Sequence, residues 1–164
     1  MIEREWGSYG GINFETNCQL QSTLPSIFRW AGSDPGLSHS CGSADGYDWV
    51  VPYTQDETCQ AQWGPYLDGI QPGTYQVGFL VHTPGDVDIV LDVAQQQGAV
   101  IEELRTSISD SDGYPCVALH GVPITSCQGT EFRIRYIGDF TDPHSLRILS
   151  TSVSPEGSTP NPCF

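Results

Sequence analysis

The sequence predicts an all-β protein, an antiparallel two-sheet β-sandwich of jelly-roll type stabilised by disulfides, and three observations support this. The 164 residues include 18 glycines and 12 prolines, which punctuate the chain with turns. No segment shows sustained helical periodicity. Roughly eight to ten short segments instead alternate apolar and polar side chains between turn signals, as strands do when one face is buried.

The clearest strand is predicted from Gly73 to Val81. Its apolar side chains share one parity and would point to one buried face: Tyr75, Val77, Phe79 and Val81. The Pro72-Gly73 pair just before it is a tight-turn signal, because proline presets φ and glycine accepts a positive φ. We therefore predict a strand, a turn and this core strand, with the first short strand in the apolar run 66–70.

A second alternating segment, Val87 to Val93, follows the turn at 83–86 and is predicted to form a hairpin with the core strand. The run 47–53 is predicted to be an edge strand, because Pro52 cannot donate a ladder hydrogen bond. The other predicted strands are 12–15, 27–30, 99–108, 116–119, 122–127, 131–137 and 146–153, and for 99–108 one helical turn is the alternative.

The cysteines predict a disulfide framework. There are six, none in Cys-x-x-Cys spacing: Cys18, Cys41, Cys59, Cys116, Cys127 and Cys163. An even number in an acidic, Gly/Pro-rich chain is typical of up to three disulfides and of a secreted or cell-surface protein in an oxidising compartment. The sequence does not choose the connectivity. We favour Cys116–Cys127 as a local bridge, then Cys41–Cys59, which would pin the long loop 32–46.

We expect one β-sandwich domain over residues 1–153 and a linker-like C-terminal tail over 154–164, where SPEGSTPNP has linker composition. The first residues lack the apolar segment of a signal peptide, so a mature form or excised domain is expected. No stretch approaches the about 20 apolar residues of a membrane span.

The net charge of −14 narrows the classes of partner. All six basic residues are arginines. A surface this acidic repels phosphate backbones and anionic membranes, which disfavours nucleic-acid binding and membrane insertion. It suits an extracellular protein, a cation binder or a protein from a salty environment.

Aromatic residues in or beside loops are the candidate ligand-binding residues. Flat aromatic faces stack on sugar rings while neighbouring polar groups bind the hydroxyls. The candidates are Trp63, Trp49, Tyr47, Trp30 and Tyr53, and Trp63 and Trp49 lead because polar residues surround them. The alternative interpretation of each is packing in the core or at a sheet edge.

Asp110 and Asp112 are the candidate ligands of a structural Ca²⁺, because they alternate in an oxygen-rich loop that ends in Gly113. Short acidic loops at 45–48 and at 139–142 are similar, and a solvated acidic loop is the alternative. Catalytic residues are not predicted. His39 lies between two serines, but sequence neighbours do not make a triad and the Gly-x-Ser-x-Gly motif is absent.

Two segments carry a family resemblance. The pattern G-x-Y-x-V-x-F begins at Gly73, and E-F-R-I-R-Y-I-G spans Glu131 to Gly138 before a final apolar strand that runs to Val153. Together they resemble β-sandwich carbohydrate-binding modules of the galactose-binding-like type. The resemblance covers residues from about 47 to 153 and implies a jelly-roll fold, glycan binding and a structural Ca²⁺ between loops.

The favoured function is therefore a non-catalytic, lectin-like extracellular module that binds glycan or polysaccharide and is stabilised by calcium. The alternative is a structural subunit of an extracellular filament, coat or adhesin. Such a subunit would self-associate by lending the extended ends of the chain, up to Phe14 and through Cys163, to a neighbour.

Overall fold

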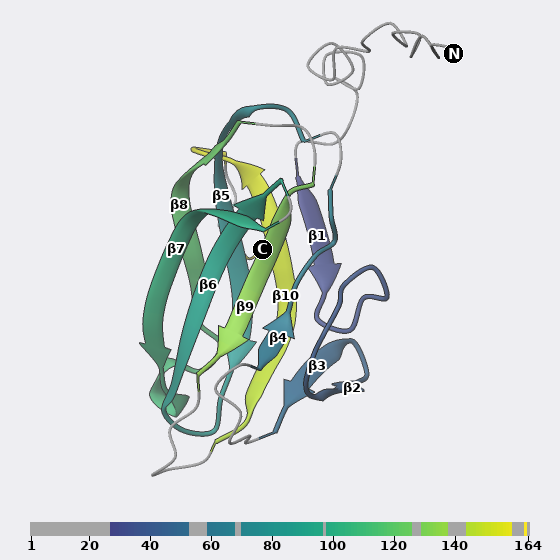
Figure 1. Cartoon of the computed structure of the whole chain (residues 1–164). Coiled ribbons are helices and arrows are strands. Elements are labelled where there is room, and N and C mark those ends of the chain that lie inside the picture. Colours follow the sequence, from purple (N-terminus) through teal and green to yellow (C-terminus); the bar gives the residue numbers. More distant parts are fainter. Residues whose placement is uncertain are drawn as a thin grey trace, which may run out of the picture.

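The computed structural model describes residues 27–52, 59–67, 70–96, 98–125, 129–137, 144–158 and 163. In these ranges the chain forms ten strands and one turn of 3₁₀ helix (Figure 1). The elements are β1 (Phe28–Ala31), β2 (Ser43–Asp45), β3 (Asp48–Val51), β4 (Gln60–Gln62), β5 (Gly73–His82), β6 (Val87–Gln95), β7 (Ala99–Ile108), η1 (Asp110–Asp112), β8 (Cys116–Ile124), β9 (Glu131–Tyr136) and β10 (Leu146–Pro155).

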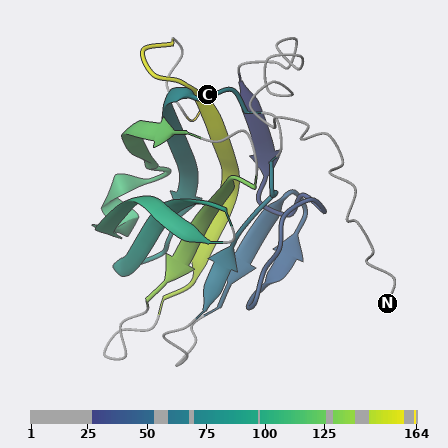
Figure 2. The ribbon, with the colours of Figure 1, turned by 45° about the horizontal axis from the view of Figure 1, so that its top comes forward.

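The strands form two stacked antiparallel sheets, which confirms the predicted β-sandwich (Figures 1 and 2). One sheet has the order β2-β3-β10-β5-β8, and β1 also pairs with β10. The other has the order β4-β9-β6-β7. From β5 onward the chain passes repeatedly between the sheets, so each sheet combines strands that are distant in sequence.

The core lies between the sheets. The alternating apolar residues of β5, β6 and β9 face each other there, and Phe79, Phe132 and Tyr136 are among its largest fully buried side chains. Burial of each such side chain stabilises the fold by roughly 1.5–3 kcal/mol. The predicted core strand and the strand predicted at 131–137 are confirmed, and their alternating apolar residues lie in the core, although in β5 the intervening positions are buried as well. The strands predicted at 27–30, 99–108 and 146–153 are also confirmed, within a few residues at their ends.

The predicted hairpin of 73–81 with 87–93 is wrong. β5 pairs with β8 and β10, whereas β6 pairs with β7 and β9 in the opposite sheet. The turn at 83–86 is therefore a corner between sheets. The alternation of apolar and polar residues shows which side chains of a strand face the core. It does not show whether two such strands are neighbours in one sheet or face each other from opposite sheets.

Three other predictions need correction. The run 66–70 forms no strand among its described residues; only Leu67 makes an isolated bridge, to Thr130. The strands predicted at 116–119 and 122–127 are one strand, β8, whose irregular register opposite β5 accommodates Gly121 at φ 67°. β3 is not an edge strand, because β2 pairs with its free side.

Two disulfides are present among the described cysteines. Cys41–Cys59 confirms the prediction that the loop 32–46 is pinned. Cys116 bonds to Cys163, so the predicted Cys116–Cys127 bridge is wrong. Proximity in sequence misled here, because the end of the chain returns to β8.

Several predictions lie outside the described residues: the strand 12–15, Cys18, Tyr53, Cys127, and the acidic pair Asp139 and Asp142. In the part of the chain that the structure describes, no helix has the length and apolarity needed to cross a membrane.

Gly32 lets the loop 32–46 start directly against β10. A Cβ added at Gly32 would lie 2.0 Å from the carbonyl oxygen of Ile148. The Gly32 amide also donates a 2.9 Å hydrogen bond to the carbonyl of Leu149. The loop therefore depends on close backbone contact that only glycine permits.

We expect Gly32→Ala to lower the free energy of unfolding by about 1–3 kcal/mol, because the new methyl group forces two backbones apart. Gly73→Ala is the matched control, since its Cβ would have only ordinary contacts from 3.4 Å outward. Urea unfolding followed by tryptophan fluorescence measures both. Equal stability of the two variants would contradict the close contact.

Candidate functional site

The loop 32–46 is fastened to its surroundings by backbone hydrogen bonds on two sides. Ser33 donates its amide to the Tyr47 carbonyl over 3.0 Å and its hydroxyl to the Gly46 carbonyl over 2.9 Å. Ser38 and Trp63 exchange two backbone hydrogen bonds of 2.9 Å. The loop thereby connects the β2–β3 hairpin to the segment that follows β4.

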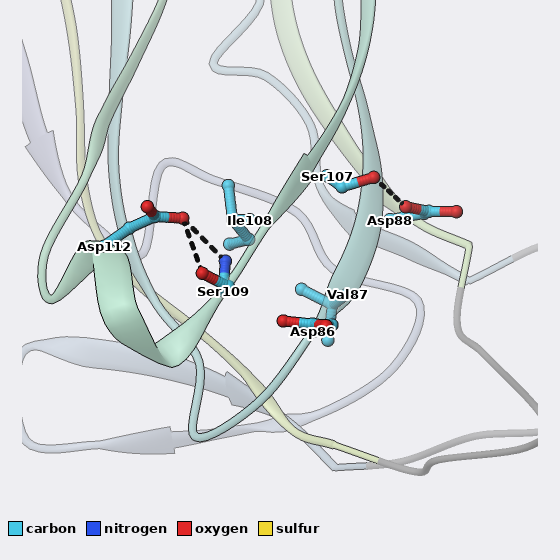
Figure 3. Close-up of a pocket in the computed structure, with 7 residues that line it drawn as sticks. All are labelled: Asp86, Val87, Asp88, Ser107, Ile108, Ser109 and Asp112. Atoms are coloured by element: carbon cyan, nitrogen blue, oxygen red, sulfur yellow. Dashed lines mark hydrogen bonds between the residues drawn. The ribbon is translucent and has the colours of Figure 1, made fainter.

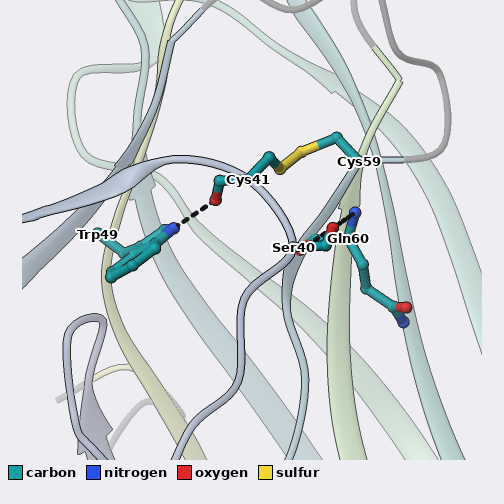
Figure 4. Close-up of a disulfide and its surroundings, with 5 residues drawn as sticks. All are labelled: Ser40, Cys41, Trp49, Cys59 and Gln60. Atoms are coloured by element: carbon teal, nitrogen blue, oxygen red, sulfur yellow. Dashed lines mark hydrogen bonds between the residues drawn. A yellow bond between two sulfur atoms is a disulfide. The ribbon is translucent and has the colours of Figure 1, made fainter.

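A disulfide and a serine complete this connection (Figure 4). Cys41 is bonded to Cys59 immediately before β4. The Ser40 hydroxyl accepts a 2.8 Å hydrogen bond from the Gln60 amide, and the Ser40 amide donates to the Gln60 carbonyl over 3.0 Å. We call the surface made by residues 33–40, the hairpin turn at Gly46-Tyr47 and residues 63–66 the loop edge.

Trp63, Tyr47 and Tyr66 are the aromatic residues of the loop edge. Trp63 is half-buried and does not belong to the apolar core of the described chain, and its indole N–H makes no hydrogen bond to the described residues. Tyr47 is 84% exposed at the hairpin turn and Tyr66 is 59% exposed. These rings are available to a ligand. Tyr66 was not among the candidates predicted from the sequence, although its position between Pro65 and a short apolar run can be read there.

Trp49 and Trp30 are engaged within the fold. The Trp49 indole N–H donates to the Cys41 carbonyl over 2.8 Å, and the His39 ring stacks on Trp49 with centroids 3.6 Å apart (Figure 4 shows the indole bond). Trp30 stacks with Phe28 and Phe132 and packs against the core. The structure thus brings Trp63 and Tyr47 to one edge of the sandwich, and it uses Trp49 and Trp30 for packing contacts.

Arg147 holds the hairpin that carries Tyr47. Its guanidinium donates to Asp48 and to Asp45, each over 2.8 Å, and these two bonds raise the pKa of Arg147. A fork of two charge-assisted bonds fixes orientation better than a single contact does. The exposed tyrosine is therefore presented on a braced turn.

A pocket where β6 begins and β7 ends is the second candidate site (Figure 3). It has a volume of about 350 Å³, and its lining residues are Asp86, Val87, Asp88, Ser107, Ile108, Ser109 and Asp112. Asp88 accepts a hydrogen bond from Ser107, and Asp112 accepts from the amide of Ser109 over 2.8 Å and from its hydroxyl over 3.1 Å. Its walls therefore offer carboxylate and hydroxyl oxygen atoms, and several of these already take part in hydrogen bonds within the protein.

The calcium prediction at Asp110 and Asp112 stays a prediction. Both residues lie in η1, and the described residues contain no group of three acidic, histidine or cysteine side chains that could hold a metal ion. Calcium takes six to eight oxygen ligands, so an ion here would need backbone carbonyls or water in addition to these two carboxylates.

The buried acid Asp92 is tied into ion pairs. Burial raises the pKa of Asp92, while the arginines beside it, Arg133 and Arg135, oppose that shift. Glu103, the partner of Asp92 in the β6–β7 register, pairs with Arg135 over 3.1 Å. This arrangement braces the outer side of the four-stranded sheet.

No protein-family model matches this chain, and no curated protein matches it. Solved structures do match. A family 61 carbohydrate-binding module in complex with β-1,4-galactotriose aligns over 79% of this chain and 88% of its own, with a TM-score of 0.51 and 14% identity. An arabinose-bound family 51 α-L-arabinofuranosidase aligns over 82% of this chain and 24% of its own, with a TM-score of 0.50 and 9% identity. The first likeness confirms the resemblance to β-sandwich carbohydrate-binding modules at the level of the fold.

Protonation of His39 should weaken the fold. Burial lowers the pKa of His39 below its ordinary value near 6.5, and the hydrogen bond to the Gly32 carbonyl only partly offsets this. The unfolded chain then binds the proton more readily than the folded chain does. The contribution of neutral His39 to the free energy of unfolding is therefore fully present above pH 6.5, and it is lost as the pH falls toward the pKa of His39 in the folded protein. We expect His39→Gln to flatten the decrease in melting temperature between pH 7 and pH 5.

His120→Gln is the control for this experiment, since the His120 side chain is 60% exposed. Equal pH dependence of the wild type and His39→Gln would show that His39 does not titrate in a buried setting.

Calcium binding at Asp110 and Asp112 can be measured by thermal unfolding. A bound ion at 100 times its dissociation constant stabilises the folded state by about 2.7 kcal/mol, so chelator should lower the melting temperature of the wild type. The double variant Asp110→Asn, Asp112→Asn should not respond. A wild type that melts at one temperature with and without chelator argues against the ion.

Proposed function

We propose that this protein is a secreted, non-catalytic module that binds glycan through the loop edge. Trp63 is the main stacking platform, and Tyr47 and Tyr66 lie on neighbouring segments of the same edge. The observation that carries the proposal is the state of Trp63, a half-buried indole outside the core whose N–H has no hydrogen bond among the described residues.

The chemistry of the loop edge supports this function. A tryptophan face stacks on the C–H face of a sugar ring, and an unengaged indole N–H can donate to a hydroxyl. Ser38, Asp34 and Gln60 add polar groups on the adjoining segments. Rigid support is provided by the Cys41–Cys59 disulfide and the Ser38–Trp63 backbone pair, so little order must be gained on binding.

The fold and the disulfides also support a secreted module that binds glycan. The matching module with a TM-score of 0.51 was solved with bound β-1,4-galactotriose. Cys41–Cys59 and Cys116–Cys163 are typical of an oxidising, extracellular setting. The filament alternative finds less support, because Cys163, which could have linked two chains, is bonded within its own chain.

Replacement of Trp63 is the direct test. We expect Trp63→Ala to weaken glycan binding at least tenfold, about 1.4 kcal/mol, while far-UV circular dichroism and the melting temperature stay close to wild type. Isothermal titration with a panel of oligosaccharides that includes β-1,4-galactotriose measures the affinity. Release of shortened products from any member of the panel would identify an enzyme instead.

Trp30→Ala is the matched control, because this tryptophan packs against the core. It should lower the free energy of unfolding by about 3–5 kcal/mol and leave the affinity of the folded fraction unchanged. If Trp63→Ala binds like wild type, or unfolds like Trp30→Ala, the loop edge is not the glycan site.

A further inference from the structure

Strand β7 is the open edge of the four-stranded sheet (Figure 1). It ends the order β4-β9-β6-β7 and pairs along one side with β6. On its other side it makes no backbone hydrogen bond to the described part of the chain. The strand has ten residues and contains no proline. A long strand whose backbone groups are unpaired on one side is a template for a further strand.

The backbone groups of Glu103 and Arg105 face this open side. In β6, the Asp88 carbonyl accepts a 2.9 Å hydrogen bond from the amide that follows β9, so the backbone of Asp88 faces β9. Backbone direction alternates along a strand, so Leu91, three residues later, faces β7, and its register partner Leu104 faces β6. The neighbours of Leu104 in β7 therefore point their N–H and C=O groups away from the sheet.

The edge of the other sheet is protected, whereas the edge at β7 is not. β8 is the corresponding edge of the six-stranded sheet and lies beside β7. In β8, Pro123 has no N–H to donate, and the register is irregular at Gly121. Proline and irregular register prevent a further strand from pairing with an edge. From Glu102 to Ile108, β7 has no proline and keeps a continuous register with β6.

Arg105 is an exposed cation without a partner on this edge. It is the one described arginine that makes no hydrogen bond or ion pair to a described residue. The other described arginines each bond to an acid or to a serine: Arg29, Arg133, Arg135 and Arg147. In a chain whose net charge is −14, an unpaired arginine on an open edge is available to an acidic group of a partner.

A second copy of β7 supplies that acidic group in one antiparallel register. Residues whose backbone faces outward must oppose each other, so Glu103 of one copy meets Glu103, Arg105 or Ser107 of the other. The first register opposes two acids, and the third opposes Arg105 to its own copy; like charges in opposite positions are unfavourable. The second register opposes Glu103 to Arg105, and symmetry makes this pair twice.

The remaining side chains of β7 also fit this register. Leu104, which is partly buried against the core, meets its own copy on the twofold axis. This is a non-hydrogen-bonded pair, in which side chains approach most closely. Glu102 comes opposite Thr106, whose hydroxyl can donate to the carboxylate. Both copies use the same surface, so the assembly closes at two chains.

We propose that β7 is a homodimer interface. Two copies pair through β7 in antiparallel orientation about a twofold axis at Leu104, and their four-stranded sheets join edge to edge. The loop edge adjoins β4, at the opposite end of the four-stranded sheet, and so stays open in both copies. The dimer goes beyond the proposed glycan binding and does not depend on it.

Sedimentation velocity of the full chain tests the interface. We expect dimers at about 100 µM protein and monomers at about 1 µM, because one pair of strands lies at the small end of specific interfaces. Arg105→Glu opposes two acids and should weaken the dimer at least tenfold. Arg29→Glu is the matched control, since it makes the same charge change at an exposed position of β1 in the other sheet, and it should dimerise like wild type.

Exchange of the two charges tests the pairing itself. The double variant Glu103→Arg, Arg105→Glu restores opposite charges across the axis, so it should recover the dimer that Arg105→Glu loses. Melting temperatures confirm that each variant is folded, which matters because Glu103 also pairs with Arg135 in its own chain. A double variant as monomeric as Arg105→Glu would show that these side chains do not face each other.

A single cysteine tests the register. In Leu104→Cys the two thiols meet on the axis, with Cα atoms about 4.5 Å apart, so oxidised glutathione should link two chains. Thr106→Cys is the control: its copy lies about 13 Å away along the strand, beyond the about 7 Å that a disulfide can span. Non-reducing electrophoresis measures both.

The outcomes decide the inference separately from the proposed function. A wild type that is monomeric at every concentration, an Arg105→Glu variant that dimerises like wild type, or crosslinking of Thr106→Cys in place of Leu104→Cys would each overturn the dimer. Glycan binding that depends on Trp63 is measured on the same preparations, and its presence or absence leaves the conclusion about β7 unchanged.

Discussion

The fold depends on the hydrogen bonds and the disulfide that link the two sheets at the edge where β4 lies. The loop 32–46 belongs to the six-stranded sheet, yet it bonds to the backbone of Gln60 and Trp63 beside β4 in the four-stranded sheet. The Cys41–Cys59 disulfide adds a covalent link at the same place. Inside the core, Gln62 Nε2 donates to Thr151 Oγ1 over 2.6 Å and ties the same strand to β10. Without these links, the short strand β4 would be held only by its pairing with β9, and the aromatic residues of the loop edge would not be held in place.

Local pattern predicted the strands of this fold well, because the apolar residues that alternate along β5, β6 and β9 form the core. It could not predict which strands are neighbours. One partner of β5 is β10, about seventy residues away, and nothing within residues 73–93 distinguishes a hairpin from a corner between sheets. The Cys116–Cys163 bond illustrates the same limit, since pairing of cysteines follows the path of the chain in space.

The candidate site was only partly predictable for a related reason. An aromatic residue beside polar neighbours can stack on a ligand or on its own core, and the sequence around Trp49 and Trp63 is similarly polar. Packing separates them: His39 and the Cys41 carbonyl engage Trp49, whereas Trp63 lies outside the core. The acidic pocket was not predicted from the sequence. Asp112, a predicted calcium ligand, lies in its wall, but Asp86 on the opposite side comes from the corner at 83–86, and this proximity becomes visible only in three dimensions.

The central claim is that a glycan binds at the loop edge through Trp63. The most direct measurement is a ¹H–¹⁵N correlation spectrum of the indole N–H groups during titration with neutral oligosaccharides. The account predicts a saturable shift of the Trp63 signal and little change for Trp30 and Trp49, whose rings are engaged in the fold. Shifts confined to Trp30 or Trp49, or an unchanged Trp63 signal at saturating ligand, would contradict it.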